Sequence, residues 1–102
     1  MSPEEIEQIK NDVKFSLINA SYDFKEKFDL ERLSKQLAYA EYRNDGLSPA
    51  SCIYWRNPKF KYTIIIWGKG KIQVVGAKSE EFAKDDIVLA VSLLEKVLLK
   101  KG

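Results

Sequence analysis

The sequence predicts an α+β fold, in which an antiparallel sheet of about five strands carries its helices on one face. Segments with helical periodicity occur at the start, middle and end of the chain, and strand-like segments between them are separated by hairpin turn residues. A chain of 102 residues also has too few helices to cover both faces of a sheet. We therefore expect one domain over residues 1–102, with one sheet face open.

The N-terminal part predicts a helix and then a long strand. Ser2 as N-cap, followed by Pro3 and two acidic residues, is typical of a helix start, and the helix is expected to end near Asn11. Residues 13–24 then have the pattern of one strand with two faces. Its better core face consists of Ile18, Ala20, Tyr22 and Phe24, and its opposite face of Val13, Phe15, Leu17, Asn19 and Ser21.

The rest of the chain predicts a second helix, several strands and a long last helix. Asp29 is a suitable N-cap for leucines that recur at helical spacing, and a short strand is expected at residues 41–43. Hairpin turns at Asn57-Pro58 and Gly68-Lys69-Gly70 then separate strands over residues 51–56, 62–67 and 71–76. Ser79 begins a helix of about 20 residues. Its apolar set is Phe82, Ala83, Ile87, Ala90, Val91, Leu94, Val97 and Leu98.

The strand "IIIW" is apolar on both faces, so each face needs a cover or a partner. We expect the helices to cover Ile64, Ile66, Ile72 and Val74. The open face would then carry Leu17, Asn19, Tyr54, Ile65, Trp67, Gln73 and Val75. An exposed apolar patch of that size is typical of a partner-binding surface.

Composition excludes several kinds of chemistry. The sequence has no histidine and a single cysteine, Cys52, which leaves no internal disulfide, zinc site or Cys-His nucleophile. The carboxylate pairs Glu80-Glu81 and Asp85-Asp86 are explained by helix capping and a solvated helix face, so we expect no enzyme and no cofactor. No apolar run approaches the ~20 residues that span a bilayer, and we expect a cytoplasmic protein without membrane contact.

The net charge is only +2, but its distribution is uneven. Between residues 56 and 78 there is no acid, and the basic residues are Arg56, Lys59, Lys61, Lys69, Lys71 and Lys78. Lysines can protect a solvated sheet edge, and they can equally form a surface that faces a polyanion. Charge alone leaves both interpretations open.

Four motifs occur in order: "ASYDFKEKFDLERLSKQL", "AEY", "NPK" and "GKIQVVGAKSEE". Together they resemble a single repeat of the TATA-box binding protein family, of the archaeal type. Members of that family carry two repeats, which form a saddle whose concave sheet binds the DNA minor groove. The resemblance implies a helical extension over residues 1–12, a repeat over residues 13–100, and a homodimer that rebuilds the saddle. The two copies would meet at the first strand, near Leu17 to Phe24.

The resemblance also assigns residues to the groove. Trp67 aligns with one wedge phenylalanine, and the second wedge falls near Leu47 or Ser48. Tyr54 stands where the family has an arginine that reaches the DNA backbone, and Arg56 keeps another arginine. The groove-facing positions of the first and last strands hold Leu17, Asn19, Gln73 and Val75, with Ile65 beside Trp67. The cations expected on phosphates are Arg56, Lys59, Lys61, Lys69 and Lys71.

Two functions remain open from the sequence. The first is a nucleic-acid-binding module of the transcription machinery that acts on the DNA minor groove as a homodimer. The second is a protein–protein interaction module, which would use the same open face, without DNA, to bind a partner such as a transcription factor. Its apolar surface would consist of Val13, Phe15, Leu17, Ile65, Trp67 and Val75.

Overall fold

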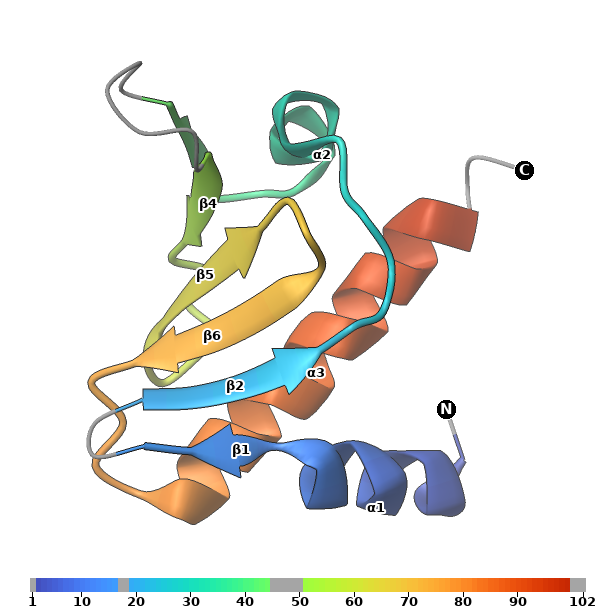
Figure 1. Ribbon diagram of the computed structural model, residues 1–102, viewed down its shortest axis with the longest axis vertical. Coiled ribbons are helices and arrows are strands. Elements are labelled where there is room, and N and C mark those ends of the chain that lie inside the picture. Colours follow the sequence, from blue (N-terminus) through green and yellow to red (C-terminus); the bar gives the residue numbers. More distant parts are fainter. Residues whose placement is uncertain (1, 17–18, 45–50, 100–102) are drawn as a thin grey trace.

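The computed structural model describes residues 2–16, 19–44 and 51–99. Its elements are α1 (Pro3–Asp12), β1 (Lys14–Phe15), β2 (Asn19–Asp23), α2 (Leu30–Gln36), β3 (Ala40–Arg43), β4 (Cys52–Trp55), β5 (Thr63–Trp67), β6 (Lys71–Val75) and α3 (Glu80–Leu99). Within these residues the six strands form one antiparallel sheet in the order β1-β2-β6-β5-β4-β3 (Figure 1). The α+β class is confirmed, with one strand more than expected.

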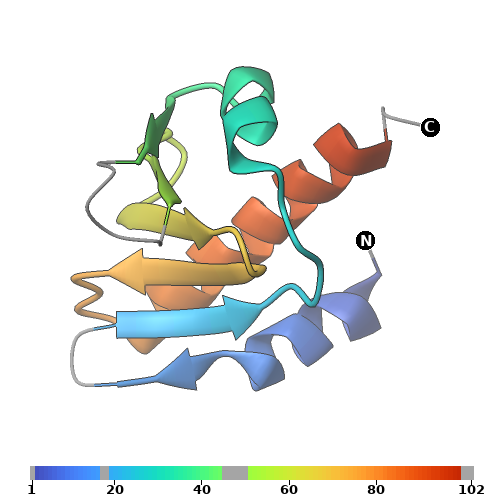
Figure 2. The same ribbon diagram turned by 45° about the horizontal axis from the view of Figure 1, so that its top comes forward.

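The helices lie on one face of the sheet, as the sequence predicts. Figure 2 shows α3 running diagonally across that face, with α1 alongside it near β1. Buried side chains of the three helices and of the strands form a single core cluster. The predicted inward set Ile64, Ile66, Ile72 and Val74 is 0% exposed. The opposite face of the strands is left without a helical layer.

The last helix forms where its capping residues predict. The backbone N–H of Phe82 donates to the Ser79 hydroxyl at 3.3 Å, and 20 residues extend about 30 Å across the sheet. Ala83, Ile87 and Leu94 are completely buried along one stripe. Phe82 was expected in that stripe, but it is 46% exposed and lies under the Lys61 ammonium at 4.6 Å. Phe82 directly precedes the buried Ala83, and successive residues of a helix are rotated by about 100° around its axis. Phe82 therefore points away from the sheet.

A buried carboxylate connects α3 to the start of β5. Among the described residues, Asp86 is the one charged residue that is buried. Its carboxylate accepts hydrogen bonds from the backbone N–H groups of Lys61 and Tyr62 at 2.9 Å each. Burial raises the pKa of this carboxyl, although the two N–H donors act in the opposite direction. The interaction satisfies two backbone donors that precede the strand and fixes them on the helix.

The expected single strand over residues 13–24 is wrong. β1 and β2 are separate strands that pair antiparallel, with Lys14 opposite Ser21 and Phe15 opposite Ala20. The chain reverses where the Ser16 N–H donates to the Asn19 carbonyl at 2.8 Å. A continuous strand would put residues 13 and 19 on the same face, since side chains alternate. The apolar Val13 is instead buried in the core, while Asn19 faces the other way.

Candidate nucleic-acid interface

The open face is organised in rows that cross the sheet. The central row runs through cross-strand partners from β1 to β3 and consists of Lys14, Ser21, Gln73, Ile65, Tyr54 and Glu41. A parallel row places Asn19 opposite Val75, and Val75 opposite Thr63. On the other side, Trp67 lies opposite Cys52, which lies opposite Arg43. The sheet therefore brings Asn19, Tyr54, Ile65, Trp67, Gln73 and Val75 onto one face, where the sequence placed them.

The Trp67 side chain lies along the open face and does not project from it into solvent. Its indole Nε1 donates a hydrogen bond to Oε1 of Gln73 at 3.1 Å. Gln73 lies on the neighbouring strand β6, opposite Ile65 rather than opposite Trp67 itself, so the indole reaches diagonally over the sheet. Because Oε1 accepts from the indole, the amide orientation is fixed and the Nε2 donors of Gln73 stay available.

The apolar patch expected on the open face is only partly exposed, since Tyr54, Trp67 and Val75 are half-buried. Ile65 lies on that face but is only 9% exposed, because the longer side chains of Gln73 and Tyr54 flank it on both neighbouring strands. Val13 is buried in the core, and Phe15 shares the helix-side face of Ala20, with the Lys84 ammonium of α3 at 5.8 Å from its ring. The hairpin reversal after β1 is the physical reason for the last two differences.

An aromatic and guanidinium cluster forms at the β3–β4 end of the face. The Arg43 guanidinium lies 4.3 Å from the centre of the Tyr54 ring, and that of Arg56 lies 5.4 Å from it. Glu41 forms an ion pair with each guanidinium group, and its Oε2 atom lies 3.3 Å from Arg43 and 3.8 Å from Arg56. Both ion pairs are exposed, so the cluster orients the two cations more than it stabilises the fold.

Asn19 presents an acceptor without a partner near the other end of the strands. Its Oδ1 atom is buried and has no hydrogen-bond partner within the described residues. Val75 lies directly opposite it on β6. A buried amide oxygen without a partner is uncommon in proteins and marks a place where a ligand donor would be favourable.

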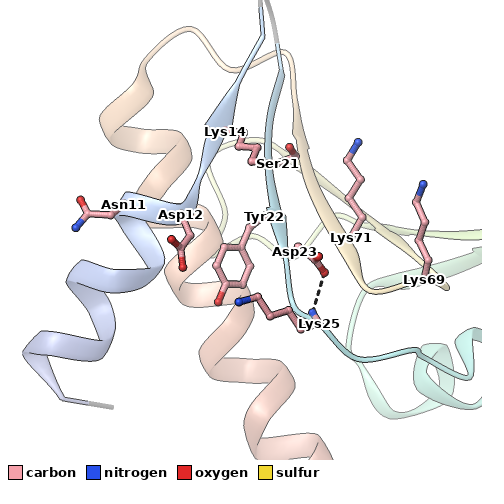
Figure 3. A pocket seen from close by; sticks show the side chains of 9 residues that line it. All are labelled: Asn11, Asp12, Lys14, Ser21, Tyr22, Asp23, Lys25, Lys69 and Lys71. Atoms are coloured by element: carbon pink, nitrogen blue, oxygen red, sulfur yellow. Dashed lines mark hydrogen bonds between the residues drawn. The ribbon is translucent and has the colours of Figure 1, made fainter.

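Lys69 and Lys71 are brought together beside a hollow at the edge of β2. Figure 3 shows the two side chains extending in the same direction, Lys71 from the start of β6 and Lys69 from the β5–β6 turn, with Ser21 and Lys14 beyond Lys71. The Tyr22 phenol lies on the other side of β2, and burial together with Asp12, Glu95 and Asp23 raises its pKa. Lys61, expected on phosphates, lies instead over Phe82 of α3 on the helix side.

Some predicted residues lie outside the described part of the chain, and some residues of the face were missed. Leu17, Leu47 and Ser48 belong to the segments that the structure does not describe. Sequence reasoning had already placed Ser21 on this face, but it missed four of the outer residues, which are Lys14, Glu41, Arg43 and Thr63. Strict alternation within β3 and β5 would have found Glu41, Arg43 and Thr63, whereas Lys14 required knowledge of the β1 pairing.

The described residues contain neither a cluster of metal ligands nor a membrane-spanning helix. Among residues 2–16, 19–44 and 51–99, no group of three or more His, Cys, Asp or Glu side chains could hold a metal ion. Over the same residues, no helix has the length and apolar character needed to cross a membrane.

Comparison with known proteins identifies the scaffold. Residues 12–97 match the model of the family described as transcription factor TFIID, or TATA-binding protein. Most of the chain is covered, from the last residue of α1 to near the end of α3. None of the curated proteins compared with the chain is similar enough to count as a match.

Proposed function

We propose that this chain, which belongs to the TATA-binding protein family, binds the DNA minor groove with its open sheet face in a transcription-related role. The proposal depends on one observation above all. All helices pack on one face, while the other presents amides, aromatic rings and cations without a helical cover. Lys14 and Arg43 stand on the two outermost strands, with Trp67 and Gln73 between them. Such a surface suits base edges in its centre and phosphates at its margins.

The fixed amide of Gln73 suggests how the centre would contact bases. Its Oε1 atom accepts from the Trp67 indole, so the Nε2 group points away from the indole and its N–H donors are left for a ligand. The minor groove of A·T pairs presents only acceptors, adenine N3 and thymine O2. Gln73 would therefore donate to A·T edges, while Trp67, whose own N–H is occupied, would supply apolar surface as a wedge or stacking platform.

A fluorescence titration with duplex DNA over a salt series tests this proposal. Trp55 is 1% exposed within the core, so a change in emission on binding reports Trp67. We expect quenching, and an affinity that falls steeply as salt rises because counterions are released from DNA. Trp67→Ala should weaken binding roughly tenfold, in the range of one lost stacking contact. Lys96→Gln, at an exposed position of α3 on the helix side, is the control.

The protein–protein interaction alternative has less support on this face. The large hydrophobic side chains that are exposed in the described chain are Phe15, Tyr39 and Phe82. Phe15 and Phe82 lie on the helix side, and Tyr39 precedes β3. A wild-type protein that binds no duplex at any salt concentration would contradict the DNA proposal and favour this alternative. Unchanged DNA affinity in Trp67→Ala would contradict only the role given to the indole.

We also propose that two copies join as a homodimer, in the manner of the family's two repeats. The contact was expected at residues 17–24, but β1 occupies the outer edge of β2 at Ala20 and Ser21. The copies would therefore meet along β1, whose outer edge has no partner strand among the described residues. Lysines near this edge repel each other, so DNA and added salt should both favour the dimer. Sedimentation should give twice 11.7 kDa at micromolar concentration. A monomer both with and without DNA would contradict the dimer.

A further inference from the structure

A hollow lies at the outer edge of β2 and extends beyond the open face. In the part of the chain that the structure describes, β1 pairs with Ala20 and Ser21, and no strand pairs with this edge of β2 from Tyr22 onward. A hollow of about 670 Å³ lies there, between the end of α1 and the β5–β6 turn. Its lining residues lie on both sides of the strand, and Figure 3 shows Lys69 and Lys71 on one side and Lys25 beside Tyr22 on the other.

The backbone around this hollow is closely packed. The N–H groups of Phe24 and Phe28 donate to the carbonyls of Gly70 and Gly68 at 2.9 and 2.8 Å, which fastens the segment after β2 to the β5–β6 turn. Gly70 has a φ of 102°, and a Cβ there would lie 2.2 Å from the Glu26 carbonyl oxygen, so only glycine fits. The lysines on either side of the hollow are therefore held by a fixed backbone.

In the described part of the chain, the charged side chains that line the hollow are mostly lysines, and these lysines form no ion pairs with the lining aspartates. Four lysines face it, Lys14, Lys25, Lys69 and Lys71, against the carboxylates of Asp12 and Asp23. Within the described residues, none of these four ammonium groups forms an ion pair. The Asp23 carboxylate is engaged in a local turn. Its Oδ1 accepts a hydrogen bond from the Lys25 backbone N–H at 2.8 Å, which supports the positive φ of Lys25.

We propose that this hollow binds the sugar-phosphate backbone of a nucleic acid strand that leaves the open face across the edge of β2. Lys14, Ser21 and Lys71 belong both to the open face and to the hollow, so the two surfaces are continuous. Lys25 lies around the edge and would contact a further phosphate of the same strand. Ammonium groups are good phosphate ligands, and cations on both sides of β2 fit a chain of phosphates better than one small anion.

Lys25 provides the sharpest test, because the open-face proposal by itself gives it no role. Lys25→Gln and Lys27→Gln remove the same charge from the same exposed segment, but only Lys25 lines the hollow. Affinity for duplex DNA should be measured against salt for the wild type, both variants and Trp67→Ala. Loss of one phosphate contact should reduce the salt slope by about 0.9, and the affinity up to about eightfold near 0.1 M salt. We expect this for Lys25→Gln and not for Lys27→Gln.

The outcomes separate this inference, which rests on the proposed function, from that function itself. If Trp67→Ala weakens binding while Lys25→Gln equals the wild type, the hollow is not part of the path, and the open face still binds DNA. Equal losses in both lysine variants would indicate general charge attraction and overturn the inference. If the wild type binds no duplex, inorganic pyrophosphate is titrated while the amide signals of Lys25, Gly70 and Lys71 are followed by NMR. If pyrophosphate shifts these signals and Lys25→Gln abolishes the shifts, the hollow binds phosphate as a free ligand. If no signal shifts, the inference that the hollow binds phosphate groups is overturned.

Discussion

The two faces of this sheet are built from the same strands but are covered in different ways. On the helix side, aliphatic residues such as Ile64 and Ile66 are completely buried in the core formed with the helices. On the open side, Ile65, between them in sequence, is buried almost as well although no helix covers it. Its cover consists of Gln73 and Tyr54 on the neighbouring strands, with Trp67 hydrogen-bonded to Gln73. The comparison teaches that low exposure has two origins here, a packed layer and a thin polar-aromatic cover.

The largest expected effect compares these two kinds of burial directly. Ile64→Ala should lower the free energy of unfolding by about 3 to 4 kcal/mol, because it leaves a cavity in a packed layer. Ile65→Ala should cost only about 1 to 2 kcal/mol, since the flexible side chains above it can collapse into the space. Urea unfolding of both variants gives the two values. Equal losses would show that the open face is as rigidly packed as the helix side.

A second prediction concerns the buried charge on the helix side. Asp86→Ala leaves the N–H groups of Lys61 and Tyr62 without an acceptor and should cost about 2 to 3 kcal/mol. Asp86→Asn keeps an acceptor oxygen and should cost less. Urea unfolding at neutral pH provides the comparison, and a loss in the asparagine variant equal to that in the alanine variant would mean that the charge itself is required.

The pH dependence of the same residue follows from its raised pKa. Burial makes the folded state hold this proton more tightly than the unfolded state, whose carboxyl has the ordinary pKa of 3.8. Asp86 therefore contributes stability that is present below 3.8 and is lost as the pH rises through the raised value. The stability of Asp86→Asn relative to the wild type should accordingly increase over that pH range. A constant difference would contradict the raised pKa.

The smallest expected effect belongs to the polar cover of the open face. Gln73→Ala removes the acceptor of the Trp67 indole and should change stability by about 1 kcal/mol or less. It should nevertheless alter the emission of Trp67 and weaken binding to A·T-rich duplex roughly fivefold, because a minor-groove donor is lost. Gln36→Ala, at an exposed end of α2, is the matched control. An unchanged emission spectrum in Gln73→Ala would contradict the indole hydrogen bond.

Most of the sheet could be predicted from local patterns, but its N-terminal edge could not. Alternation within β5 and β6 placed Ile64 and Val74 inside, and Trp67 and Gln73 outside, because a strand has only two sides. The same rule failed at Val13, since the chain reverses between β1 and β2 and the alternation restarts. The reversal lets Val13 join the helix layer while β1 covers part of the β2 edge.

The sequence by itself determined the α+β class, the family, and which side chains of the hairpin strands face the helices. Those features follow from periodicity, capping residues and ordered motifs, which act over a few residues at a time. Only the tertiary structure decided how Ile65 is covered, how Arg43 and Arg56 gather on Tyr54, and how lysines from three separate segments surround one hollow. These features depend on strand order and register, and cross-strand neighbours far apart in the sequence leave no local pattern.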